Sequence, residues 1–295
     1  MIQEPKRCQH VMPSLEYFFV TLLCIQSVCA SSFNEDVSSV GKTSMQLSAI
    51  RAVASNANTT HYSDPMASIL AGPKMLTAVQ ARADSEMRQR KWHVSPHVGR
   101  HMILDAMIHN VVVASCHAPR QVVIIGAGMD TRAYRLGESL PALRWWEVDQ
   151  AEIVKIKEEM LIESGMDVTR AGRIVRVALN LESDIGNLLP RLQDAGFDPN
   201  SPAIFLLEGL VYYLPAKVVS DLLSSIPTLP TNRIFVSIMK RKTRTYFRRK
   251  AEQAGREELW KCDLEELCSD QVFPPKSWRL IRRVQTNTRG ARKLK

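Results

Sequence analysis

Short apolar runs alternate with longer amphipathic segments through the middle of the chain. The runs rich in Val, Ile, Leu and aromatic residues are typical of buried strands, and they lie at residues 121–125, 143–148, 174–178, 203–207 and 234–239, with a weaker sixth at 278–284. Helix-like segments lie between and after them, at 151–163, 183–195, 215–226 and about 246–267. Strands that alternate with helices in this way predict a parallel sheet covered by helices on both faces.

A helical region precedes this alternation. Residues 44–113 have a helical pattern, with breaks at Asp64-Pro65 and Gly72-Pro73. The predicted fold class is therefore α/β, a doubly wound, mostly parallel sheet of the seven-stranded type with a helical N-terminal cap. We divide the chain into a leader (1–30), the cap (31–113) and an α/β domain (114–295), and we expect the cap and the α/β domain to form one compact unit.

The first 30 residues have the pattern of a targeting signal. Lys6 and Arg7 precede an apolar stretch at 17–25, and Val-Cys-Ala at 28–30 offers the small residues that a signal peptidase prefers. This pattern predicts a cleaved leader and entry into the secretory pathway or an organelle. The alternatives are a buried N-terminal helix or a start codon further downstream, and either would leave the protein in the cytoplasm.

The positive charge of the chain is concentrated near its C-terminus. The 295 residues contain 39 Lys and Arg against 30 Asp and Glu, a formal net charge of +9. Residues 240–250 and 279–295 hold 14 of the basic residues and no acidic one, so 25 basic residues face 30 acidic ones elsewhere. These two segments are either solvated faces or a contact surface for an anionic partner. No nucleic-acid-binding module accompanies them, which disfavours nucleic acid.

The cysteines and the apolar runs exclude several protein classes. Three of the six cysteines lie in the leader, and the other three, an odd number, lack paired spacing, which argues against a disulfide framework. Cys262 and Cys268 have no companion ligands at zinc spacing, so no metal is expected. No run of 18 apolar residues is present, which excludes a protein with several membrane-spanning helices.

A glycine-rich turn follows the first strand of the alternation. Gly126 and Gly128 let the backbone turn sharply and approach a ligand, and the next helix offers its free N–H groups there. Asp149 ends the second strand 21 residues later, where nucleotide-binding folds place a carboxylate on ribose hydroxyls; Glu147 is the competing acid. Thr131 replaces the third glycine of the dinucleotide fingerprint. A nucleoside ligand without phosphates therefore fits better, and S-adenosylmethionine (SAM) is the predicted cofactor.

Several segments together resemble the leucine carboxyl methyltransferase family. They are residues 122–136 (VVIIGAGMDTRAYRL), 147–150 (EVDQ) and 195–215 (AGFDPNSPAIFLLEGLVYYLP), preceded by 61–70 (HYSDPMASIL) and 97–108 (HVGRHMILDAMI). The similarity covers about residues 44–226. It implies a Rossmann-like class I fold and a SAM-dependent O-methyltransferase activity.

The resemblance also implies cofactor-binding roles for individual residues. They are Arg100 at the methionine carboxylate, Gly126 and Gly128 lining the cofactor, Asp149 at the ribose, Asn180 and Leu181 beside the adenine, and Glu208 facing the methionine or sulfonium region. The family usually has Asp at the Asn180 position, but the amide carbonyl can still accept a hydrogen bond from the adenine amino group. Tyr212 and Tyr213 either help to form the methyl-transfer pocket or serve packing.

The implied chemistry needs no proton-transfer residue, so we assign no catalytic residue. A carboxylate acceptor is already ionised at neutral pH, and Arg100 and Arg132 could orient it, although Arg132 could equally be a structural ion-pair partner. The sequence predicts a SAM-dependent O-methyltransferase that methylates a carboxylate of a small-molecule or peptide-like acceptor. The alternatives are an NAD-dependent oxidoreductase and a non-catalytic protein that acts through its basic C-terminus.

Overall fold

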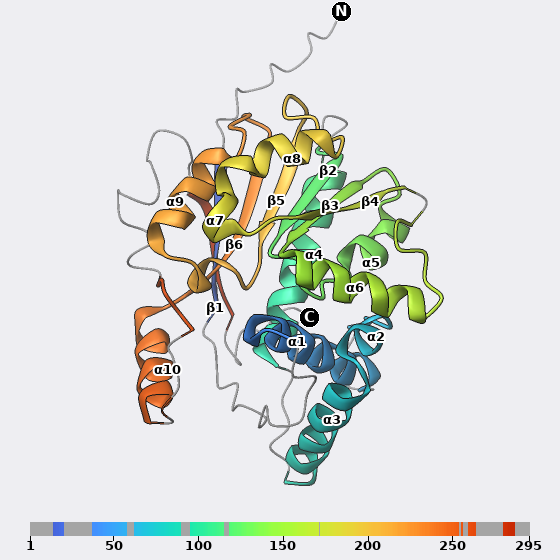
Figure 1. The fold of residues 1–295 in the computed structure, drawn as a ribbon, viewed down its shortest axis with the longest axis vertical. Coiled ribbons are helices and arrows are strands. Elements are labelled where there is room, and N and C mark those ends of the chain that lie inside the picture. The colour runs from blue at the N-terminus through green and yellow to red at the C-terminus, as the bar shows by residue number, and fades with distance from the viewer. Residues whose placement is uncertain are drawn as a thin grey trace, which may run out of the picture.

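One parallel sheet organises the protein (Figure 1). The computed structural model describes residues 14–20, 37–57, 62–89, 95–114, 118–170, 172–253, 255, 259–263 and 280–286. Seven strands lie in the order β4-β3-β2-β5-β6-β1-β7, and every neighbouring pair is parallel. They are β1 Ser14–Val20, β2 Gln121–Ile125, β3 Arg144–Asp149, β4 Ile174–Ala178, β5 Ala203–Leu207, β6 Arg233–Met239 and β7 Leu280–Thr286. The predicted fold class is confirmed, and each of the six predicted strands is present.

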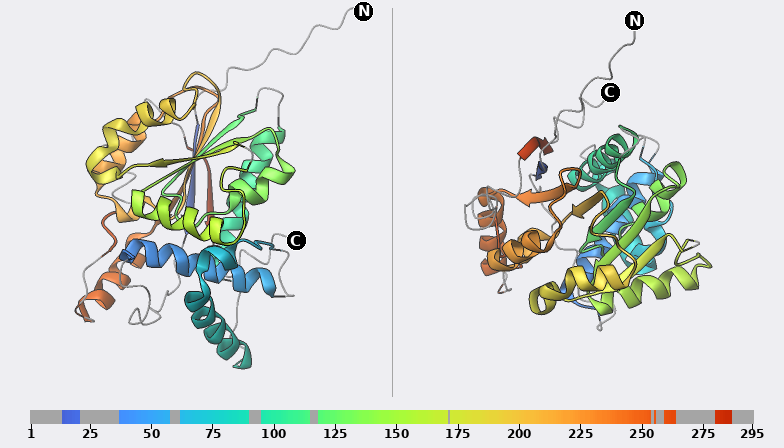
Figure 2. Two further views of the ribbon diagram at one scale, coloured as in Figure 1. Left: turned by 45° about the vertical axis from the view of Figure 1, so that its right-hand side comes forward. Right: turned by 90° about the horizontal axis from the view of Figure 1, so that it is seen from above.

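Side chains of the central strands alternate between two apolar cores. In β2, Val122 and Ile124 pack into one core, whereas Val123 and Ile125 pack into the other, as the two-residue period of a strand requires. The first core is covered by α4 (Pro96–Val113), α5 (Arg132–Ser139) and α6 (Ala151–Glu163), and the second by α8 (Leu188–Asp194) and α9 (Ala216–Ser225). Figure 2 shows helices on both sides of the sheet. Burial on both faces explains why these strands are continuous apolar runs.

The helices before the sheet form a separate layer at one of its edges (Figure 1). This layer contains α1 (Ser39–Asn56), α2 (Ala67–Ala71) and α3 (Pro73–Arg88), and α1 and α3 share a small apolar cluster of their own. The predicted break at Gly72-Pro73 is present, because Gly72 has a positive φ of 71° and Pro73 begins α3. The next helix, α4, packs on the sheet itself, although it lies within the range expected for the cap.

Two predicted helices differ from the observed ones. The helix expected at 183–195 is split into α7 (Leu181–Asp184), a 3₁₀ turn (Ile185–Asn187) and α8, and the turn contains Gly186, a poor helix former. The helix expected at about 246–267 is wrong at both ends, because α10 is Arg241–Gln253 and residues 259–263 are not helical. Gly255, at a positive φ of 61°, follows the end of α10, which is a typical helix stop.

The N-terminal strand β1 lies inside the segment predicted to be a leader. It pairs along its full length with β6, from Ser14 opposite Arg233 to Val20 opposite Met239, and with β7 on its other side. The rest of the leader segment, 1–13 and 21–30, lies outside the described residues, so cleavage stays a prediction. Among the described residues, no helix is long and apolar enough to cross a membrane.

Candidate active site

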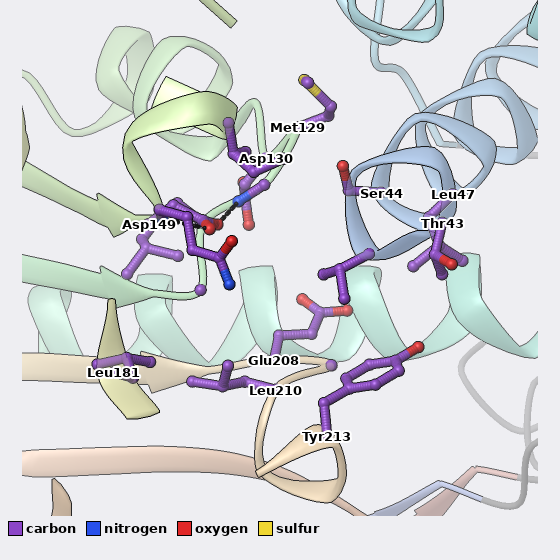
Figure 3. Close-up of a pocket in the computed structure, with 18 of the residues that line it drawn as sticks. Thr43, Ser44, Leu47, Met129, Asp130, Asp149, Leu181, Glu208, Leu210 and Tyr213 are labelled. Atoms are coloured by element: carbon purple, nitrogen blue, oxygen red, sulfur yellow. Dashed lines mark hydrogen bonds between the residues drawn. The ribbon is translucent and has the colours of Figure 1, made fainter. Parts of the chain in front are cut away.

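A cavity lies at the carboxyl ends of β2, β3, β4 and β5 (Figure 3). Because the strands are parallel, the segments that follow them meet at one edge of the sheet. Figure 3 shows Glu208 and Tyr213, from the segment after β5, facing Thr43, Ser44 and Leu47 of α1. All seven residues predicted to bind the cofactor line this cavity: Arg100, Gly126, Gly128, Asp149, Asn180, Leu181 and Glu208. Their contact with a cofactor remains a prediction.

The glycine turn is fixed by its backbone conformation and by Asp149. Gly126 has φ of 70°, and a Cβ atom there would lie 2.8 Å from Cδ1 of Leu210. The N–H of Gly128 donates to Oδ2 of Asp149 at 2.6 Å, and the N–H of Gln150 donates to Oδ1 at 2.7 Å (Figure 3). Burial raises the pKa of the Asp149 carboxyl, and these two N–H groups oppose that shift. The carboxylate predicted to hold the ribose therefore also holds the turn.

The expected adenine end of the cavity contains Asn180 and Leu181. Oδ1 of Asn180 accepts the N–H of Glu182 at 2.9 Å and so caps α7, as Asn commonly does at this position. An adenine amino group would have to share that oxygen with the cap. Leu181 is buried and lines the cavity, so it offers an apolar surface for a purine ring.

Glu208 follows β5 and is surrounded by cationic and polar groups. Its Oε1 lies 2.5 Å from Nε of Arg100, and its Oε2 lies 2.6 Å from Nη2 of Arg132 and 3.3 Å from Nδ1 of His101. Burial alone would raise the pKa of the Glu208 carboxyl, but the Arg132 and Arg100 guanidiniums hold it well below its usual range. Glu208 is therefore ionised, and two guanidiniums share its charge, which reduces its attraction for a sulfonium.

Arg132 is a structural ion-pair partner, one of the two roles left open by the sequence. Its side chain is fully buried and contacts three carboxylates, those of Asp105 at 2.6 Å, Asp130, and Glu208. It is not among the residues that line the cavity, so the other role, orienting an acceptor, finds no support in the structure. Arg100 does line the cavity, and its Nη2 has no hydrogen-bond partner among the described residues.

An ion-pair network that the sequence did not reveal joins the helical layer to the glycine turn. Arg51 of α1 donates to Oδ2 of Asp64 at 3.0 Å and to the carbonyl of Met129. The hydroxyls of Tyr62 and Thr131 donate to the same Asp64 oxygen at 2.9 and 2.8 Å. Thr131, which occupies the position of the third glycine of a dinucleotide fold, therefore helps to anchor the cap. Thr131 and the Asp64-Pro65 pair were both noted in the sequence, but their contact was not predicted.

One group of potential metal ligands lies next to the cavity among the described residues. His101, Asp130 and Glu208 each present a ligand atom, and these atoms lie within 4.8 Å of one another. The Arg132 guanidinium contacts both Asp130 and Glu208, so the positive charge that these carboxylates need is already supplied by the chain. The arrangement is that of an ion-pair cluster.

Part of the basic segment 240–250 is neutralised within the chain. In α10, Arg241 and Arg244 lie 3.5 and 3.7 Å from Oδ2 of Asp263, and Arg248 lies 3.7 Å from Glu252. The other basic segment, 279–295, is described only as far as its residues belong to β7. An anionic partner for these segments remains a prediction.

The fold and the cavity define an α/β protein with a pocket at the carboxyl ends of its parallel strands, where such folds bind their ligands. The family profile described as leucine carboxyl methyltransferase matches residues 44–227, and the chain belongs to this family of SAM-dependent methyltransferases. A relative from Mycobacterium tuberculosis, named "Putative S-adenosyl-L-methionine-dependent methyltransferase", is 31% identical over 245 residues, which cover 78% of this chain and 68% of the relative. A relative of the same description from Frankia alni is 31% identical over 237 residues, 78% of this chain and 79% of the relative.

A solved structure from Thermobifida fusca, described as a "putative methyltransferase", is 14% identical with a TM-score of 0.48 and covers 77% of this chain and 78% of its own. The predicted family, the SAM-dependent methyltransferase class and SAM as cofactor are confirmed by the family membership. The NAD-dependent oxidoreductase and the non-catalytic binding protein find no support among these relatives.

Proposed function

We propose that this methyltransferase transfers the methyl group of SAM to a carboxylate oxygen of a small or peptide-like acceptor. The observation that supports a carboxylate acceptor is the set of titratable side chains in the described part of the cavity wall. It contains two histidines, the usual general bases near neutral pH, and neither is suited to accept a proton there. An acceptor that is already ionised needs no such group.

The two histidines of the cavity wall are poor bases. Burial and the Arg100 guanidinium lower the pKa of His97 to about 3, and burial and the Arg132 guanidinium lower the pKa of His101. A group with so low a pKa provides little driving force for deprotonating a hydroxyl. Glu208 is ionised but held by two arginines, as described above. A carboxylic acid of pKa about 4 is deprotonated without help at neutral pH.

The reaction would form a C–O bond and break the C–S bond of the sulfonium, whose electron pair stays on sulfur, so no proton moves. The chain then contributes positioning and exclusion of water. Holding two reactants in line is worth up to about 7–11 kcal/mol in favourable cases. The helical layer that α1 brings over the strand ends suits this role, because Arg51 fixes it to the turn at Met129.

Methyl esters can be recognised even before the natural acceptor is known. The chain is incubated with SAM labelled in the methyl group and with pairs of acceptors that share a skeleton, one a carboxylic acid and the other the corresponding alcohol. Alkali releases labelled methanol from a methyl ester but not from an ether. We expect alkali-labile label with the acids only.

The pH dependence provides the second test. With a carboxylate acceptor, single-turnover methyl transfer should be nearly flat from about pH 6 to 9, because the acceptor stays ionised throughout. Alkali-stable label, or a steep rise with pH that follows a group near 7 or above, would show that a hydroxyl or thiol is methylated. The methyltransferase class would survive that result, but the carboxylate acceptor would not.

A further inference from the structure

His97 is a buried polar side chain without a partner. It is the second residue of α4, it is 6% exposed, and it lines the cavity. Neither Nδ1 nor Nε2 has a hydrogen-bond partner among the described residues. Buried polar groups in native proteins are nearly always hydrogen-bonded, because an unmade bond costs stability. A cavity-lining imidazole with two unmade bonds therefore points to a ligand that supplies at least the partner of its N–H donor.

The neighbours of His97 indicate the chemistry of that ligand. Arg100 lies three residues further along α4, so the two side chains share one face of the helix. Arg100 uses Nε for Glu208 and Nη1 for the hydroxyl of Tyr212, which leaves Nη2 for a ligand. A neutral imidazole beside a guanidinium offers a second donor without a second positive charge. This set of donors fits a carboxylate.

The position of Glu208 favours the cofactor as the source of that carboxylate. An amino-acid group carries a carboxylate and an ammonium close together. Arg100 and Glu208 lie side by side, and because an ionised carboxylate has about four acceptor sites, Glu208 can still accept a hydrogen bond from an ammonium although two guanidiniums share its charge. The N-terminal end of α4 adds a favourable potential for an anion. An acceptor carboxylate has the same chemistry but needs no acidic neighbour.

We propose that His97 donates a hydrogen bond to the α-carboxylate of SAM beside Arg100, and so selects cofactors that retain their amino-acid end. The proposal rests on the proposed function only in taking SAM as the cofactor. It assigns a cavity contact to a residue for which the sequence analysis predicted no role.

The test compares two ligands on the full-length chain by calorimetry. S-adenosylhomocysteine carries the amino-acid end, whereas 5′-methylthioadenosine has the same nucleoside and thioether without it. His97→Phe keeps a ring of similar size and removes both nitrogens. This substitution should weaken the binding of S-adenosylhomocysteine by about 10-fold or more, which is the effect of losing a hydrogen bond to a charged group. It should change the affinity for 5′-methylthioadenosine by less than about twofold.

Stability of the ligand-free protein gives an independent readout. His97→Phe should raise Tm, because two buried unpartnered nitrogens are removed. His97→Gln, which keeps a donor, should recover part of the affinity for S-adenosylhomocysteine. His109→Phe is the matched control on the same helix, because His109 is exposed and does not line the cavity; it should change neither affinity nor Tm.

Several results would overturn the proposal. An equal loss of affinity for both ligands, or a lower Tm for His97→Phe, would show that His97 shapes the pocket. An unchanged affinity for S-adenosylhomocysteine together with a raised KM for the acceptor would assign the carboxylate to the acceptor. A wild-type chain that binds neither ligand would sink this proposal and the SAM assignment together. A selective loss in His97→Phe without any methyl ester product would support the His97 contact and refute only the carboxylate acceptor.

Discussion

Replacing Arg132 by Met should destabilise the protein strongly, because Arg132 lies at the centre of a buried ion-pair cluster. Its guanidinium, fully buried, contacts Asp105, Asp130 and Glu208. Asp105 and Glu208 each keep a second arginine when Arg132 is removed. Asp130 has no other ion-pair partner among the described residues. The substitution therefore leaves one buried carboxylate without an ion-pair partner, held, in the part of the chain that the structure describes, only by the backbone N–H of residue 132.

The expected size of the effect follows from that orphaned carboxylate. Removing one partner of a buried ion pair typically costs about 3–5 kcal/mol. Burial alone would raise the pKa of Asp130, but the Arg132 guanidinium lowers it from an ordinary 3.8 to about 2. A shift of that size corresponds to about 2 kcal/mol of stability at neutral pH. The double variant Arg132→Met/Asp130→Asn also removes the charge of Asp130, so it should regain the stability that this unpaired charge costs. We expect it to be more stable than Arg132→Met by about 1–2 kcal/mol.

Urea unfolding of the wild type and the two variants, at pH 7 and at steps down to pH 2, measures these differences. Because the folded pKa of Asp130 is depressed, its contribution is present above the unfolded pKa near 3.8 and is lost as the pH falls towards 2. The difference in the free energy of unfolding between the wild type and Arg132→Met should therefore become smaller in that pH range. A loss below about 1 kcal/mol at pH 7, or a double variant no more stable than the single one, would refute the cluster as a stabilising unit.

Three further predictions concern the turn, the cofactor and the N-terminal strand. Asp149→Ala should weaken SAM binding by about 1–3 kcal/mol in calorimetry, and Asp149→Asn by less because it keeps an acceptor oxygen for the N–H of Gly128; equal affinities for all three forms would contradict the assignment. Gly126→Ala should lower the free energy of unfolding by more than about 1 kcal/mol, because φ is 70° and Leu210 is 2.8 Å from the new Cβ; an unchanged urea midpoint would show that the turn adapts. N-terminal sequencing of the protein from its native source should find the mature start near residue 31, whereas a start before Ser14 would keep β1 in the sheet and contradict the leader.

The sheet and its strand ends could be predicted because their signals are local. Strands β2 and β5 were predicted to the residue, since burial on both faces makes each a continuous apolar run. The bounds of β4 were also predicted, although this strand contains Arg176 and is only partly buried. Parallel topology then brings the segments after the strands together, so Gly126, Asp149 and Glu208 could be assigned to one site without knowledge of side-chain contacts.

The electrostatics of the site could not be predicted, because charge pairing depends on contacts between distant segments. Arg132 and Asp105 are 27 residues apart, and Arg100 and Glu208 are 108 apart. In the sequence a buried arginine looks the same as a solvated one, so Arg132 stayed ambiguous and Arg51 went unnoticed. His97 had no signal either, since only its burial without a partner distinguishes it.

Calorimetric titration of the full-length chain with SAM, and separately with NAD, decides whether the cavity at the carboxyl ends of β2 to β5 binds SAM. We expect saturable binding of SAM at one site per chain, weakened in Asp149→Ala, and no binding of NAD because Thr131 is engaged with Asp64 where a dinucleotide fold needs a glycine. Binding of NAD in place of SAM, or SAM binding that is indifferent to Asp149→Ala, would contradict the account.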